Sequence, residues 1–193
     1  MRINIKNNKT YSAEEIRRAN DIANPALDKI WAMQWLSDCI HKKDEAKIET
    51  YNEYVSTLTQ TYEVILVVAG REERASIKAV IDLFDPKEGY PEIVFMPLNF
   101  SISDYASVLR RLENKTVALL AISIMEESLE LRCAYSVAKH FVTSQANKAK
   151  ISPEICVIYS ERSRTIKEDA FENEYTKMEV SHRTDPSYLA NTD

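Results

Sequence analysis

Short apolar segments that alternate with helical segments constrain the fold of this chain more than any other sequence feature. The first such segment, Val64–Ala69, is apolar throughout and rich in β-branched residues, which is typical of a strand buried in a parallel sheet. A segment with apolar residues at helical spacing follows it and ends near Pro86. The unit then repeats. Further strands are expected at 92–97, 116–122, 155–159 and 177–180, and further helices at 103–112, 127–143 and 164–172.

This alternation predicts an α/β domain with a parallel sheet of about five strands, right-handed crossovers and helices on both faces. We expect the domain to span residues 61–183, after an N-terminal helical extension over 1–60 and before a C-terminal tail over 184–193. The extension begins with a capping box, because Ser12 and Glu15 precede apolar residues at helical spacing.

The loops at the carboxyl ends of the strands are where ligands bind in such sheets, so those after Ala69, Ile122 and Tyr159 are candidate positions for a site. The chain contains two glycines, Gly70 and Gly89, where a chain of this length has about 13 on average. Walker loops and dinucleotide-binding fingerprints need several glycines where the backbone approaches the ligand. Glycine-rich phosphate cradles are therefore excluded.

Charge and composition exclude several classes of protein. With 25 basic and 30 acidic side chains the net charge is −5, which offers no electrostatic footprint for nucleic acid. The longest apolar runs, Val64–Ala69 and Val117–Ile122, are far shorter than the roughly 20 residues that span a bilayer. No secretory signal is visible at the N-terminus, so we expect a cytoplasmic protein. The scattered cysteines and histidines show no metal-ligand spacing, and we expect neither a metal nor a cofactor.

Two segments carry a resemblance to a known family. Leu66–Asp82 runs without gaps along the pattern V-V-I-G-I-G-G-S-Y-L-G-A-R-A-A-I-E, and Ile122–Glu130 runs along I-S-K-S-G-T-T-T-E. These patterns belong to the N-terminal half of glucose-6-phosphate isomerase, whose lobes carry the sugar isomerase (SIS) fold. The resemblance covers residues 50–190 approximately. It implies a Rossmann-like three-layer domain and places the two segments at the family's phosphate-holding loops.

The resemblance also implies that the phosphate site is degenerate. In the family, consecutive glycines and hydroxyl side chains of these loops hold the phosphate of the sugar, whereas this chain has carboxylates in both loops. A carboxylate about 6 Å from a phosphate opposes its binding by on the order of a few kcal/mol. The candidate substrate-binding residues, at the degenerate phosphate-loop positions, are Gly70, Arg71, Glu72, Glu73, Ser123, Met125, Glu126, Glu127 and Ser128.

We therefore expect a non-catalytic, degenerate SIS domain that acts as a binding or interaction module. No catalytic residue is assigned, because the family takes its base, a histidine and a lysine from a second lobe that we do not expect in a chain of 193 residues. Self-association into a homo-oligomer such as a dimer, or binding of another protein, would cover helices that pack against that lobe in the family. The alternative is a phosphosugar isomerase or phosphosugar-binding protein of this family, alone or completed by a partner chain.

Two further hypotheses concern the acidic residues of these loops. The carboxylates either form a site for a cation or an amine, or they are solvated at helix N-termini, where negative charge is favourable. Arg71 and Arg74 are close to them in sequence and could pair with them and close the cleft.

Overall fold

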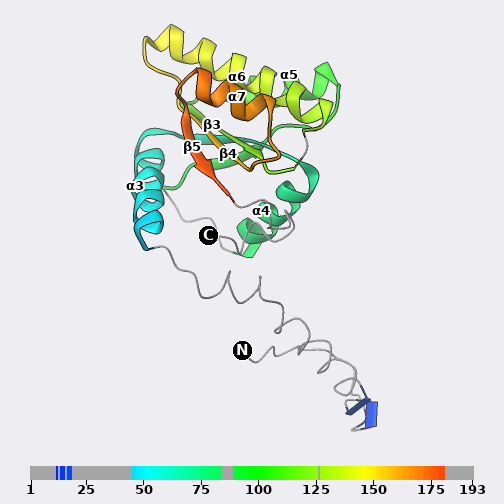
Figure 1. The fold of residues 1–193 in the computed structure, drawn as a ribbon. Helices are drawn as coiled ribbons and strands as arrows, with labels where there is room; N and C mark the ends of the chain where they lie inside the picture. Colours follow the sequence, from blue (N-terminus) through cyan, green and yellow to red (C-terminus); the bar gives the residue numbers. More distant parts are fainter. Residues whose placement is uncertain are drawn as a thin grey trace. The chain divides into compact units, whose positions relative to one another are not determined.

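The computed structural model describes residues 12, 14–15, 17–18, 45–83, 89–125 and 127–180. The chain divides into two compact units, Met1–Lys43 and Asp44–Asp193. The second unit, drawn in Figure 1, contains the following helices and strands: α3 (Glu45–Thr61), β1 (Val64–Ala69), α4 (Arg71–Leu83), β2 (Glu92–Phe95), α5 (Ile102–Leu112), β3 (Val117–Ser123), α6 (Leu129–Ala149), β4 (Ile155–Tyr159), α7 (Thr165–Glu172) and β5 (Thr176–Glu179).

In the first unit, the described residues include the predicted capping box. The Ser12 backbone N–H and hydroxyl each donate to a Glu15 carboxylate oxygen at 2.8 Å, and the Glu15 backbone N–H donates to the Ser12 hydroxyl at 3.2 Å. This reciprocal pairing satisfies donors that a helix start otherwise leaves open. Residues 1–11, 13, 16 and 19–44 of the predicted extension, and the predicted tail, lie outside the described residues, so the proposed domain boundaries stay predictions.

The second unit is built on a five-stranded sheet in the order β2-β1-β3-β4-β5, with every neighbouring pair parallel. This confirms the predicted α/β class and parallel sheet. The central strands are apolar on both faces, and Leu66, Leu119 and Val157 are at most 1% exposed. The outer strands β2 and β5 are shorter and carry exposed residues: the first two residues of β2 are exposed, and in β5 the exposed Lys177 and Glu179 alternate with half-buried residues.

Helices cover both faces of this sheet (Figure 1). On one face a large apolar cluster joins the strands to α5, α6 and α7, and Ala134 and Ala138 let α6 approach closely. On the other face a smaller cluster joins Val67 and Ile122 to Ile77 of α4. The apolar side chains of the central strands are thus divided between two cores, which is why these strands contain few polar residues.

Serine hydroxyls mark the starts of two helices. The Ser101 hydroxyl accepts from the Asp104 backbone N–H at the start of α5, and the Ser128 hydroxyl accepts from Leu131 at the start of α6. The sequence predicts that the helix after Ser128 ends at residue 143, which is too early. The helix α6 continues to Ala149 because its apolar stripe does, with Ala146 only 5% exposed, and Lys150 then ends it in a left-handed conformation.

Candidate functional site

The strands β1, β3 and β4 end side by side at one edge of the sheet. Ala69 is in register with Ile122, and Ser123 is in register with Tyr159. The segments that follow these strands lead into α4, α6 and α7. Because parallel neighbours end at the same edge, loops that are about 50 and 90 residues apart in the sequence converge there.

Most of the predicted site residues line one cavity at this edge, with a volume of about 380 Å³. Sequence reasoning expected a loop after β1, but α4 begins directly at Arg71, so Glu72 and Glu73 lie in its first turn. There the helix dipole favours negative charge. Ser123 and Glu127 are not part of the lining of this cavity, and Glu126 lies outside the described residues. The lining residues are Gly70, Arg71, Glu72, Glu73, Leu98, Met125, Ser128, Glu130 and Leu131.

The carboxylate of Glu127 lies instead at the N-terminus of α7. It accepts hydrogen bonds from the backbone N–H groups of Arg164 at 3.1 Å and of Thr165 and Ile166 at 3.0 Å each. The residue at the N-cap position, Arg164, provides no side-chain cap of its own. A glutamate from a loop 37 residues earlier therefore caps this helix.

Buried serine hydroxyls complete this arrangement around Glu127. Ser123 Oγ and Ser163 Oγ each lie 3.0 Å from Glu127 Oε1 and 2.8 Å from one another, and both serines are at most 3% exposed. The Ser160 hydroxyl, which is fully buried, donates to the Ile124 carbonyl and accepts from the Arg162 backbone N–H. We call Glu127, Ser123, Ser163 and the N-terminus of α7 the Glu127 cap.

The hydrogen bonds of this cap determine the ionisation of Glu127. Partial burial by itself would raise the pKa of the carboxyl. The hydrogen bonds from the Ile166 backbone, Ser163, Ser123 and the Arg164 backbone outweigh burial and hold the pKa of Glu127 below its usual range. The group is therefore a carboxylate at neutral pH, and the sheet edge holds a fixed negative charge that the chain itself supplies.

Glu73, in the first turn of α4, is in the opposite situation. Its side chain is only 4% exposed, and burial, followed by the nearby Glu72 charge, raises the pKa of Glu73 against a weaker opposing effect of its own backbone N–H. The carboxylate lies so close to Gly70 that a Cβ atom there would collide with Glu73 Oε2. Glycine at position 70 thus accommodates the close approach of this side chain, which a larger residue would displace.

The two arginines of this region do not close the cleft. Arg74 lies over the Phe95 ring, with its guanidinium carbon 5.1 Å from the ring centroid, and donates to the Met96 carbonyl at 3.5 Å. Arg71 is exposed. Within the part of the chain that the structure describes, neither arginine forms an ion pair with a glutamate, so the pairing hypothesis is not supported.

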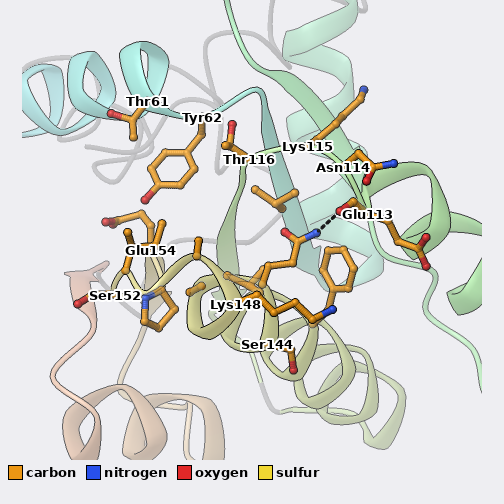
Figure 2. A pocket seen from close by; sticks show the side chains of 18 residues that line it. Thr61, Tyr62, Glu113, Asn114, Lys115, Thr116, Ser144, Lys148, Ser152 and Glu154 are labelled. Atoms are coloured by element: carbon orange, nitrogen blue, oxygen red, sulfur yellow. Dashed lines mark hydrogen bonds between the residues drawn. The ribbon is translucent and has the colours of Figure 1, made fainter.

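A larger cavity of about 850 Å³ lies at the opposite, amino edge of the sheet, between the end of α3, the starts of β3 and β4 and the last turns of α6 (Figure 2). Two of its charged side chains, Glu154 and Lys115, have partners within the fold. Glu154 accepts from the Tyr54 hydroxyl at 2.8 Å, and Lys115 pairs with Glu92 at 2.7 Å. Figure 2 shows Lys148 and Ser144 on α6 at this cavity. Because ligands of such sheets bind at the carboxyl edge, we take the smaller cavity as the candidate site.

Sequence reasoning did not predict Leu98, Glu130 or Leu131 in the lining of the smaller cavity, and it missed the Glu127 cap. Most of the cap's donors are backbone N–H groups of 164–166, which have no side-chain signature. Ser160 and Ser163 were the available signal, since serines that follow an apolar strand are typical of helix starts.

Metal-ligating clusters and membrane-spanning helices are both missing from the described part of the chain. Its residues include no group of three or more His, Cys, Asp or Glu side chains arranged to hold a metal ion. None of the described helices has the length and apolar character to cross a membrane.

Comparison with known proteins gives matches among solved structures. No family model matches the chain, and no curated protein matches it in sequence. A hypothetical protein of Thermus thermophilus matches with a TM-score of 0.70 at 13% identity, over 93% of this chain and 43% of that one. A glucose-6-phosphate isomerase of Chlamydia trachomatis matches with a TM-score of 0.58 at 14% identity, over 79% of this chain and 30% of that one.

This chain spans less than half the length of either matched structure. At these identities the likeness concerns the backbone architecture and not the residues of a site. The chain therefore has an α/β fold similar to that of part of a glucose-6-phosphate isomerase.

Proposed function

We propose that this chain is a non-catalytic binding or interaction module with a phosphosugar-isomerase-like fold, and that the carboxyl edge of its sheet no longer holds a sugar phosphate. The observation that carries this proposal is the Glu127 cap. Two hydroxyls and three backbone N–H groups already donate to the Glu127 carboxylate. An anion of the chain thus occupies donors that an anionic ligand would use at a helix N-terminus.

Displacing Glu127 in favour of a phosphate is unfavourable. Each hydrogen bond to a charged group contributes about 1.5 to 3 kcal/mol, so expelling the carboxylate loses several such contributions at once. The expelled carboxylate would also remain on the loop after β3, close to the incoming phosphate, and like charges repel. Ser123, which matches the family pattern, is already engaged by Glu127 and is fully buried.

The charge of the neighbouring cavity supports the same conclusion. Glu72, Glu73 and Glu130 line it against a single arginine, Arg71. At an intermediate dielectric, one carboxylate about 6 Å from one phosphate charge costs about 3 kcal/mol. Binding of a phosphosugar would have to overcome this repulsion before any favourable contact contributed.

The interaction that we propose uses apolar side chains near this edge. Ile102 at the start of α5 is 83% exposed, Phe100 before it is 58% exposed, and Leu129 at the start of α6 is 56% exposed. Contact with a second copy of the chain would remove these apolar side chains from water, which is favourable. We propose self-association through them, which analytical ultracentrifugation tests by comparing the wild-type chain with Ile102→Glu. A wild-type dimer that Ile102→Glu dissociates is expected, and a monomer at all concentrations would contradict self-association.

The second candidate function is phosphosugar isomerisation or phosphosugar binding. The observation in its favour is the fold likeness to a glucose-6-phosphate isomerase, together with the Ser123 and Ser128 hydroxyls at two positions of the second loop. This second function predicts that fructose 6-phosphate binds to the folded chain and raises its melting temperature by mass action.

A thermal-shift experiment distinguishes the two functions. The full chain is heated with millimolar fructose 6-phosphate and, in parallel, with fructose as the uncharged control. We expect no shift with either sugar. A shift with fructose 6-phosphate alone would overturn the non-catalytic proposal and favour the isomerase family function.

A second arm tests the charge argument directly. The variant Glu72→Gly/Glu73→Ser/Glu126→Gly/Glu127→Thr restores the family's residue types in both loops, and the single variant Glu127→Thr guards against a fourfold change that does not fold. We expect at least one of them to gain a shift with fructose 6-phosphate. If both fold and neither gains one, charge is not what prevents binding, and that part of the proposal is wrong.

A further inference from the structure

We propose that the cavity at the carboxyl edge binds a primary ammonium group carried on an aliphatic stem, and that the Glu73 carboxylate receives it. This inference rests on the proposed function, because it names a ligand class for the same site. The ligand chemistry has two sources, a free alkylamine or the lysine side chain of a protein, and the experiment below separates them.

The first step is the burial of Glu73 without a partner. The residue is 4% exposed and lines the cavity together with Gly70, over which its carboxylate lies. Among the residues that the structure describes, the side chain has no hydrogen-bond or ion-pair partner beyond its own backbone N–H. A carboxylate with little access to water is stabilised by a cation brought to it through the cavity that it lines. The raised pKa of Glu73 has the same physical origin.

The second step is the charge around Glu73. Glu72 and Glu130 also line the cavity, and Arg71 is the basic residue of the lining. None of these three side chains forms an ion pair with another described residue. The lining therefore has an excess of negative charge that no ion pair between described residues neutralises, and a cation entering the cavity is attracted from more than one side.

The third step is the apolar part of the cavity. Leu98, Met125 and Leu131 line it beside the carboxylates, so a hydrocarbon stem can be buried while the charged end meets Glu73. The volume of about 380 Å³ suits a short chain rather than a large ligand. A bare metal ion is a poorer match, because the described residues hold no cluster of three ligating side chains.

The experiment is isothermal titration calorimetry on the full chain with 1,5-diaminopentane, and with 1-pentanol as an uncharged probe of the same stem. We expect saturable binding of the diamine and none of the alcohol. Glu73→Gln keeps the shape of the side chain and removes its charge, and we expect affinity for the diamine to fall about tenfold or more. Glu172→Gln, an exposed position on α7 outside the cavity lining, is the matched control and should bind as the wild type does.

A second variant keeps the proposal testable if Glu73→Gln does not fold. Arg71 is exposed, so Arg71→Ala should leave the fold intact, and removing this positive charge should strengthen diamine binding. Wild-type chain that binds no diamine, or binds it with an affinity that neither variant changes, overturns the inference.

Two further ligands distinguish a free amine from a protein lysine, and failure of this inference from failure of the proposed function. Nα-acetyl-lysine amide that binds as tightly as the diamine indicates a protein lysine, whereas binding of the diamine alone indicates a free amine. If neither amine nor fructose 6-phosphate binds, this inference fails and the proposed function stands. If fructose 6-phosphate binds, the proposed function fails, whatever the amines do.

Discussion

The carboxylate of Glu127 lies 3.0 Å from the hydroxyl of Ser163, and this contact joins the loop after β3 to the segment that begins α7. The two residues are 36 positions apart in the sequence. A chain with hydroxyl and glycine residues at the Glu127 loop would leave the N-terminus of α7 open to solvent or to a ligand. Here the chain closes that end of the helix itself, and the consequences for stability can be measured.

Replacing Glu127 by glutamine is expected to destabilise the domain. The amide keeps the size of the side chain, but charge-assisted hydrogen bonds to the backbone N–H groups become neutral ones, and one amide group cannot accept from all the donors. We expect the free energy of unfolding to fall by about 1 to 3 kcal/mol. Urea denaturation measures this, with Glu172→Gln as the exposed control on the same helix. An unchanged midpoint would show that the cap contributes nothing.

The Glu127 carboxyl also makes the stability of the domain depend on pH, in a direction that follows from its lowered pKa. Because the pKa of Glu127 is lower in the folded chain than its ordinary value of 4.5, its carboxylate stabilises the fold above that pH, and the stabilisation is lost as the pH falls through the folded value. We therefore expect the wild-type domain to lose more stability than Glu127→Gln on acidification below 4.5. Urea midpoints measured across the acid range test this, and parallel curves for the two chains would contradict it.

Glutamine at position 73 is expected to have the opposite effect at neutral pH. Burial raises the pKa of Glu73, so its charged form opposes folding above the folded-state value, and the penalty disappears as the pH falls. Glu73→Gln should unfold at higher urea than the wild type at neutral pH, by more than the roughly 0.5 kcal/mol typical of surface changes. The gain should shrink towards acid pH. A destabilised Glu73→Gln at neutral pH would indicate that the carboxylate has a partner.

Alanine at position 70 tests the contact between Gly70 and Glu73. The added methyl group meets the Glu73 carboxylate, and we expect a loss of about 1 to 3 kcal/mol in the free energy of unfolding. Most of this loss should disappear in the double variant Gly70→Ala/Glu73→Ala, so a double-mutant cycle measures the coupling. Gly89→Ala is the control for a glycine replacement without a steric contact. At this position an added Cβ meets no atom, and only the backbone φ of 91° is unfavourable for alanine. Equal losses with and without Glu73 would contradict the contact.

The sequence by itself determined the architecture. Strands that are apolar throughout, such as Val64–Ala69, are buried only when helices pack on both faces of their sheet. Helical segments long enough to cross over the sheet lie between these strands in the sequence. Because such crossovers are right-handed, the local pattern predicts a parallel sheet. The sequence also located the acidic residues near the ends of β1 and β3, because strand ends are recognisable from composition. Helix limits were less well determined, since α4 begins at Arg71 and α6 extends to Ala149 through side chains whose burial depends on packing.

Only the tertiary structure decided what each of these acidic residues does. Glu72, Glu73 and Glu127 are alike in sequence terms. Yet Glu73 is buried with no side-chain partner among the described residues, while Glu127 caps a helix that follows a different strand. The difference arises because a carboxylate's state depends on burial and on donors that the fold brings from distant segments. Most of those donors are backbone N–H groups, which every residue except proline carries, and no local pattern can show where they will point.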